Sequence, residues 1–202
     1  MNLPVHIESK HLFKPSPKVS VYYPLVAKLP DSSVQKKMNL DIISQSNNLV
    51  IDQGFYNENL VEMIGYFEIK NNQRAILSLS LIVYSFTGGA HGITICKPLT
   101  FDVATGKLYS LKDLFKQNSD YVKVLSTIIA RKIREWEIPV LEEFREIRVD
   151  QDFYIADHCL VIFFQVYEIT PYVYNFPYFP IPIKDIENII RPGGPLEIML
   201  PF

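Results

Sequence analysis

The chain has 202 residues, which is enough for a buried core in one domain or in two closely packed halves. Its 48% hydrophobic and 21% charged residues are typical of a folded globular protein rather than a disordered one. The net charge of −2, without any long run of Lys or Arg, argues against a nucleic-acid partner, and the longest uninterrupted apolar run, residues 159–164, is far shorter than the roughly 20 residues of a membrane span.

The amino-terminal residues 1–18 predict an arm that precedes the folded part. They contain no basic stretch followed by an apolar stretch, so we expect no secretion signal and a cytoplasmic location for the chain as written.

Residues 19–87 predict an amino-terminal lobe. Residues 18–26 alternate β-branched and aromatic side chains and predict a strand. Asp31 is a suitable N-cap, and Val34, Met38 and Ile42 recur every four residues, which predicts a helix over 31–46. Two further strands follow, and the polar residues 70–73 between them predict a hairpin turn.

Residues 88–202 predict a carboxyl-terminal lobe. A short hairpin loop is expected at 104–106, with Gly106 in the left-handed conformation, and one turn of helix at 111–115. The periodicity predicts a long amphipathic helix capped by Asn118 or Ser119, then a hairpin that turns at 156–158. An aromatic and proline-rich segment precedes a short helix at 183–190.

This order of elements predicts the fold class. Groups of strands alternate with single helices, which favours an α+β fold with antiparallel sheets, two main amphipathic helices and a short C-terminal helix. The two halves share a similar order of strands and helices, which would suit a pair of associated lobes.

The glycine-rich stretch FTGGAHG at 86–92 is first considered as a phosphate-binding loop. Such loops need a helix after the glycines, and here a strand follows, so nucleotide binding is disfavoured. A structural turn is favoured, in which glycines supply positive φ or avoid collisions and the histidine holds the turn. The residues assigned to it are Gly88, Gly89, His91 and Gly92.

The stretch YEITPYVYNFPYFPIP at 167–182 concentrates large rings on a chain stiffened by prolines. Such rings either pack into the core, which is the favoured alternative, or form a stacking surface for sugars or peptides. The binding hypothesis assigns them with one nearby acid to a ligand surface: Glu168, Tyr172, Tyr174, Phe176, Tyr178 and Phe179.

The sequence gives little support for a metal site or a nucleophilic thiol. The spacing of Cys96 and Cys159 makes no metal pair, and free thiols are favoured over a bridge. His158 and Cys159 are neighbours in a strand and point to opposite faces, which is unsuitable for mutual proton transfer. We therefore expect no metal, no cofactor and no catalytic residue.

Three motifs occur together in order: TGGAHG, then TFDVATGKLYSLKDLF, then FYIADHCLVIFFQVYEITPYVYNFPYFPIP. With them, residues 19–190 resemble an uncharacterised domain family found in the extracellular part of a lysozyme-sensing anti-sigma factor of bacilli and ahead of the catalytic domain of a bacterial peptidoglycan deacetylase. The resemblance implies an α+β fold of two associated parts and a binding role. Members often carry Gly where this chain has Asn175, which tolerates the same left-handed backbone.

The leading hypothesis is a non-catalytic bacterial binding module that recognises a lysozyme-like protein or a peptidoglycan fragment. One alternative is a hydrolase of a cell-envelope substrate that uses His91 with Glu168 or with another, unassigned acid. Another is a structural subunit of an envelope or spore assembly. The oligomeric state is left open.

Overall fold

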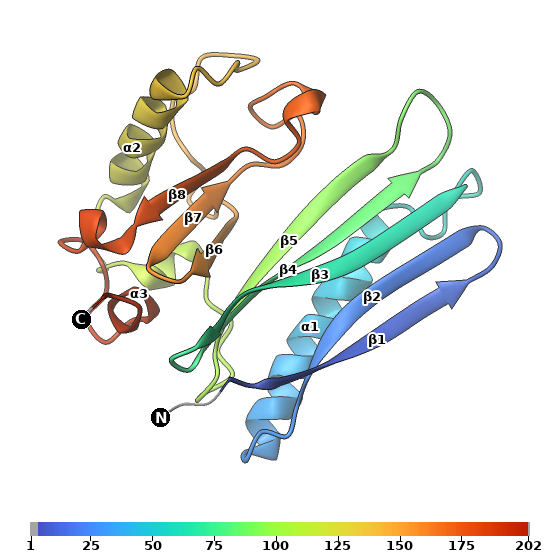
Figure 1. Ribbon diagram of the computed structural model, residues 1–202, viewed down its shortest axis with the longest axis horizontal. Coiled ribbons are helices and arrows are strands. Elements are labelled where there is room, and N and C mark those ends of the chain that lie inside the picture. Colours follow the sequence, from blue (N-terminus) through green and yellow to red (C-terminus); the bar gives the residue numbers. More distant parts are fainter. Residues whose placement is uncertain (1–3, 202) are drawn as a thin grey trace. The chain divides into compact units, whose positions relative to one another are not determined.

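The computed structural model describes residues 4–201 and divides the chain into two compact units, Met1–Leu108 and Tyr109–Phe202 (Figure 1). Each unit contains one sheet and helices, so the predicted α+β class is confirmed. The sequence places the boundary between lobes after residue 87, but the first unit extends to Leu108. The reason is that the strands on either side of residue 87 pair antiparallel with each other along ten residues.

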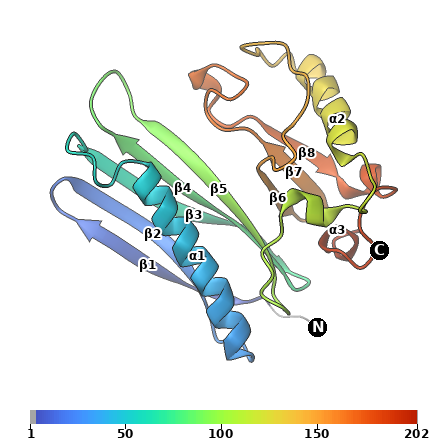
Figure 2. The ribbon, with the colours of Figure 1, turned by 180° about the vertical axis from the view of Figure 1, so that it is seen from behind.

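Unit 1 is a five-stranded sheet of order β1-β2-β3-β4-β5 with one long helix, α1, lying across one face (Figure 2). Neighbouring strands are antiparallel except β2 and β3, which are parallel because α1 connects them as a crossover. The bounds are β1 His6–Lys14, β2 Lys18–Ala27, α1 Ser32–Asp52, β3 Glu62–Gln73, β4 Ile76–Phe86 and β5 Ile93–Asp102.

The core of unit 1 lies between α1 and the sheet. Met38 and Ile42 of the predicted helical stripe are fully buried there, against alternate residues of β4 such as Leu77 and Leu79. Asp31 is the N-cap, as predicted, and its carboxylate accepts bonds from the backbone N–H groups of Ser33 and Val34.

Two expectations for unit 1 are wrong. The predicted arm contains β1, which pairs with β2 along all nine of its residues, while residues 1–3 of that arm lie outside the described part of the chain. The hairpin turn also lies further along than residues 70–73. Asn71 and Asn72 belong to β3, and the chain turns at Arg74 and Ala75, whose φ values are 54° and 59°.

Unit 2 is a three-stranded antiparallel sheet of order β6-β7-β8 with the helix α2. The core contains Leu125, Ile129 and Ile133 of α2, and the ring of Trp136 stacks on Phe179 of β8 with centroids 6.0 Å apart. The bounds are the 3₁₀ turn η1 Leu111–Leu114, α2 Tyr121–Glu135, β6 Phe153–Ala156, β7 Cys159–Phe163, η2 Tyr172–Tyr174, β8 Tyr178–Pro182, η3 Ile183–Ile186 and α3 Pro195–Ile198.

Several local predictions for the second half need adjustment. The N-cap of α2 is Asp120 rather than Asn118 or Ser119. The helix expected over 183–190 is reduced to the 3₁₀ turn η3, and the last helix is α3 instead. The turn at 156–158 lies where expected, with Asp157 at a φ of 47° between Ala156 and Cys159, which pair.

Candidate functional site

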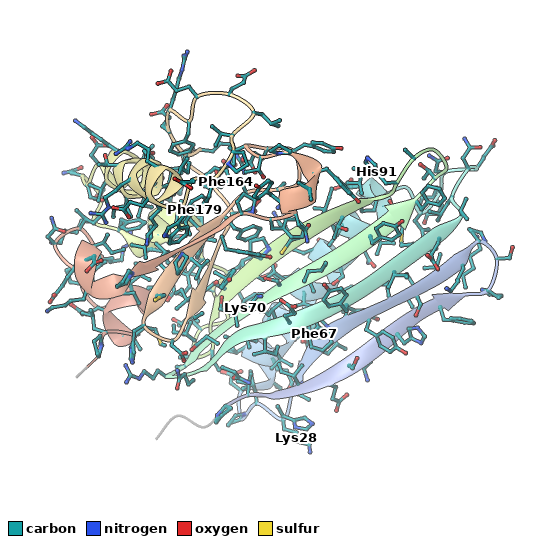
Figure 3. The ribbon with its side chains drawn as sticks, turned by 45° about the horizontal axis from the view of Figure 1, so that its top comes forward. Lys28, Phe67, Lys70, His91, Phe164 and Phe179 are labelled. Atoms are coloured by element: carbon teal, nitrogen blue, oxygen red, sulfur yellow. The ribbon has the colours of Figure 1, made fainter. Side chains whose placement is uncertain are left out.

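The aromatic segment 167–182 contributes both to the core of unit 2 and to its surface. Phe179 is fully buried and packs edge-on against Phe164, as Figure 3 shows below α2. Phe176 is 7% exposed and also lies edge-on to Phe163, and Tyr178 is half-buried. Phe176 and Phe179 therefore do not belong to a ligand surface, which corrects the binding hypothesis for these two residues. Their packing in the core of unit 2 stabilises the segment.

The exposed part of the segment is its first half, which we call the tyrosine tip and define as residues 167–175. Tyr174 is 47% exposed and Val173 is 82% exposed, while Tyr172 is half-buried. The rings of Tyr167 and Tyr172 contact each other, with centroids 5.5 Å apart. Tyr167 and Val173 could not be singled out from the sequence, because nothing in the pattern distinguishes an exposed ring or valine in this segment from a buried one.

The backbone of the tyrosine tip is held in one conformation. Pro171 begins the 3₁₀ turn η2, in which the N–H of Tyr174 donates to the carbonyl of Pro171 at 3.0 Å. The turn ends at Asn175, whose φ of 53° agrees with the positive φ expected where related sequences have glycine. A rigid aromatic tip loses little conformational entropy when it binds a partner.

Glu168 anchors the tip from within unit 2. Its carboxylate accepts hydrogen bonds from the backbone N–H of Gln165 at 2.7 Å and from the side-chain amide of Gln151 at 3.2 Å, and it is paired with the guanidinium of Arg148. These partners occupy both carboxylate oxygens, and only 20% of the side chain is exposed. Glu168 is thus a residue that positions the tip.

A groove of about 760 Å³ lies next to the tip. One wall consists of residues 167–169, and the other is the connection that follows α2. The backbone N–H of Leu141 donates to the carbonyl of Ile169 at 2.9 Å and joins the two walls. The second wall is acidic, because it carries three carboxylates and only one guanidinium. The carboxylates belong to Glu142, Glu143 and Glu146, and the guanidinium belongs to Arg145.

The glycine-rich turn at 86–92 has the geometry of a structural turn. Gly88 and Gly89 have φ values of 98° and 100°, and a side chain at Gly92 would lie 2.3 Å from the carbonyl oxygen of Ser85. His91 is exposed, and its Nδ1 lies 3.0 Å from the carbonyl oxygen of Gly92 (Figure 3). These residues belong to unit 1.

The hydrolase hypothesis receives no geometric support from its two residues. The ring of His91 lies against the carbonyl of Gly92, and the carboxylate of Glu168 is committed to three structural partners. Among the described residues, no cluster of His, Cys, Asp and Glu has the arrangement of a metal site.

The cysteines are free thiols. Cys96 is buried in β5, and burial, with a smaller contribution from Asp157, raises the pKa of the Cys159 thiol. A raised pKa disfavours the thiolate that a nucleophile requires. The adjacent His158 instead bonds through Nδ1 to the carbonyl of Met199 at 2.6 Å, which ties the hairpin turn to the end of the chain.

No helix within residues 4–201 is long and apolar enough to cross a membrane.

Comparison with known proteins gives a consistent assignment for both units. Residues 13–94 match the family described as Deacetylase PdaC, and residues 112–184 match a family described as a protein of unknown function, DUF3298. The resemblance predicted from the sequence is confirmed. The two family matches and the similar proteins together support a shared, uncharacterised domain family.

Two Bacillus subtilis (strain 168) proteins are similar in sequence. The anti-sigma-V factor RsiV is 26% identical over 193 residues, which cover 88% of this chain and 67% of RsiV. The peptidoglycan-N-acetylmuramic acid deacetylase PdaC is 22% identical over 117 residues, which cover 52% of this chain and only 24% of PdaC. The likeness to an anti-sigma factor suggests a binding role.

Solved structures of DUF3298 proteins show the same fold. A Bacteroides fragilis protein superimposes with a TM-score of 0.71 at 13% identity, covering 96% of this chain and 97% of its own. A Pseudomonas aeruginosa PAO1 protein gives a TM-score of 0.68 at 16% identity, covering 98% of each chain. At these identities the likeness establishes the fold alone.

Proposed function

We propose that this chain is a non-catalytic binding module that recognises a protein through the tyrosine tip of unit 2. The observation that carries the proposal is a rigid turn that exposes Val173 and Tyr174, in a segment whose first residues, 167–169, line an acidic groove and whose Glu168 is hydrogen-bonded to the backbone of Gln165. Exposed tyrosines on a fixed backbone are typical of protein-recognition surfaces, because they supply large contact areas with few rotatable bonds.

The charge of the groove favours a basic partner. Three carboxylates and one guanidinium on one wall attract a cationic protein more strongly than an uncharged or acidic glycan. A lysozyme-like protein is therefore the first partner to test, and peptidoglycan fragments are the second. The likeness to RsiV, a protein named for action on a sigma factor, supports protein binding, whereas the deacetylase activity in the name of PdaC is not proposed for this chain.

The test is titration calorimetry of the purified chain with hen egg-white lysozyme. We expect binding by the unchanged chain and at least about a tenfold loss of affinity in the double variant Tyr172→Ala/Tyr174→Ala, since central aromatic side chains dominate the binding energy of such surfaces. Tyr56→Ala is the matched control, because Tyr56 is a 77% exposed tyrosine in unit 1. The proposal fails if the tip variant binds as tightly as the control, or if the unchanged chain binds neither lysozyme nor any other basic protein recovered from its host.

A further inference from the structure

A second group of exposed rings lies on the sheet of unit 1, on the face turned away from α1. It consists of Phe13 of β1, Tyr22 of β2 and Tyr66 of β3, which are 63%, 46% and 49% exposed. The three strands lie side by side in the sheet (Figure 1). We call these three rings the sheet platform.

The strand register places the three rings on one face. His11 pairs with Tyr22, and Phe13 pairs with Ser20, so these four residues share a face of the antiparallel pair. In the parallel pair, Val21 is opposite Gly65, which brings the next residues, Tyr22 and Tyr66, to neighbouring positions. Adjacent strands are about 4.8 Å apart, so the rings are close neighbours.

Successive side chains of these strands alternate between the platform face and the buried face of the sheet. Val21 and Met63 point toward α1 and are 3% and 0% exposed, whereas their neighbours on the platform remain open. Contiguous exposed apolar patches of a few hundred Å² are often functional.

The orientation of the rings is partly fixed. The imidazole of His11 stacks on Tyr22 with centroids 4.1 Å apart and an angle of 2° between the planes. Its Nε2 lies 3.0 Å from the hydroxyl oxygen of Ser20. The platform thus combines flat apolar faces with hydroxyl and imidazole groups that form hydrogen bonds.

The charges around the platform neutralise each other. Lys18 is paired with Glu62 at 2.5 Å, and Lys70 is paired with Glu68 at 2.5 Å. A phosphate backbone or another polyanion requires cations that are not already paired, so the platform is poorly suited to nucleic acids or acidic polymers. Its chemistry matches an uncharged ligand.

The three rings of the platform offer a small apolar area. A large aromatic side chain offers about 200 Å², so the exposed fractions of the three rings give roughly 300 Å². A standard protein interface buries about 800 Å² on each partner, and a stable dimer of this chain would need at least as much. A few sugar rings match the platform in size.

We infer that the sheet platform binds an uncharged glycan built of linked pyranose rings. The apolar C–H faces of the sugars stack on Phe13, on Tyr66 and on the face of Tyr22 opposite His11, while sugar hydroxyls exchange hydrogen bonds with the tyrosine hydroxyls and with Ser20. This site lies in unit 1 and is separate from the tyrosine tip of unit 2, so the two binding activities can be lost independently.

The test is calorimetric titration of the full chain with chitohexaose and cellohexaose as uncharged probes. We expect binding of at least one of them, and a loss of affinity of about tenfold or more in Tyr22→Ala/Tyr66→Ala, since each ring supplies a stacking surface. Tyr56→Ala, at a 77% exposed tyrosine of unit 1 outside the platform, is the matched control and should bind the glycan like the unchanged chain. Tyr22→Ala/Tyr66→Ala replaces two half-exposed side chains. The second variant, Tyr22→Phe/Tyr66→Phe, keeps the rings and should retain most of the affinity.

Three results would overturn the inference. The first is that neither oligosaccharide binds the folded, unchanged chain. The second is that Tyr22→Ala/Tyr66→Ala and the control Tyr56→Ala bind the glycan equally well. The third is that Tyr22→Ala/Tyr66→Ala leaves glycan binding intact and abolishes lysozyme binding, which would make the sheet face a protein-binding surface.

Discussion

The carboxylate of Glu168 accepts a hydrogen bond from the backbone N–H of Gln165, three residues earlier, at 2.7 Å, and so closes the base of the tyrosine tip. Arg148 and Gln151 bind the other carboxylate oxygen. Removal of this carboxylate would take away the acceptor of the Gln165 N–H in a mostly buried position, and would leave Gln151 with Phe163 and Arg148 with Asp150 and Asp152 as their other partners.

Glu168→Ala should therefore lower the free energy of unfolding of unit 2 by about 2 kcal/mol. Urea unfolding followed by the fluorescence of Trp136 measures this, because Trp136 is the single tryptophan of the chain and lies in unit 2. Glu187→Ala is the control, since Glu187 makes an exposed ion pair with Lys184, and it should change stability by less than about 0.5 kcal/mol. Equal effects of the two variants would contradict the anchoring role of Glu168.

Asn175 ends the tyrosine tip with φ 53° and ψ −117°, a conformation that is unfavourable for residues with a side chain. Asn175→Ala should destabilise unit 2 by about 1 kcal/mol, while Asn175→Gly should leave stability unchanged or raise it. The same Trp136 fluorescence assay separates the two variants. If alanine is tolerated as well as glycine, the backbone of the tip is less constrained than the structure indicates.

Gly65 allows β2 and β3 to approach closely in unit 1. A methyl group at this position would lie 2.6 Å from Cγ1 of Val21 and 3.1 Å from Cγ2 of Val83. Gly65→Ala should lower the free energy of unfolding of unit 1 by about 1–3 kcal/mol through overpacking. Urea unfolding followed by far-UV circular dichroism measures the loss, with the half-exposed Ile64→Ala as control. An unchanged unfolding midpoint for Gly65→Ala would show that the strands separate without strain.

The N-cap of α1 predicts a dependence of stability on pH. Hydrogen bonds from the Ser33 side chain and from the backbone N–H groups of Val34 and Ser33 lower the pKa of the Asp31 carboxyl. Because the folded-state pKa is the lower one, this carboxylate contributes stability above its unfolded pKa and loses it as the pH falls through the folded pKa.

Asp31→Asn keeps a capping side chain that does not titrate. The stability advantage of the unchanged chain over this variant should therefore be present at pH 7 and should shrink on acidification to about pH 3. Far-UV circular dichroism during urea unfolding at the two pH values gives the comparison. A difference between the two proteins that stays constant with pH would show that the Asp31 charge does not stabilise the helix.

Elements that depend on local chemistry were predictable from the sequence. The alternation in residues 18–26 predicts β2, and Asp31 followed by apolar residues every four positions predicts α1 and its N-cap. Gly106, with φ 66°, occupies the left-handed position expected of the loop at 104–106. In each case the signal comes from a few neighbouring residues whose backbone preferences agree with one another.

Elements that depend on distant partners were not predictable in the same way. Residues 6–14 carry five charged or histidine side chains and give no strand pattern, yet they form β1 because β2 offers a free edge. Asn71 and Asn72 favour a turn, but the side-chain amide of Asn72 instead bonds to Val5, which keeps them in β3. Here pairing along a strand outweighs the local preference.

By itself, the sequence determined the α+β class, the resemblance to the DUF3298 and PdaC domains and the concentration of rings at 167–182, because these follow from residue order and spacing. Only the tertiary structure decided which rings are exposed. Phe176 and Phe179 are buried and Tyr174 is open, although all three belong to one segment, because burial depends on what packs against each side chain. The same reason explains the sheet platform, since Phe13, Tyr22 and Tyr66 are distant in sequence and become neighbours only through strand pairing.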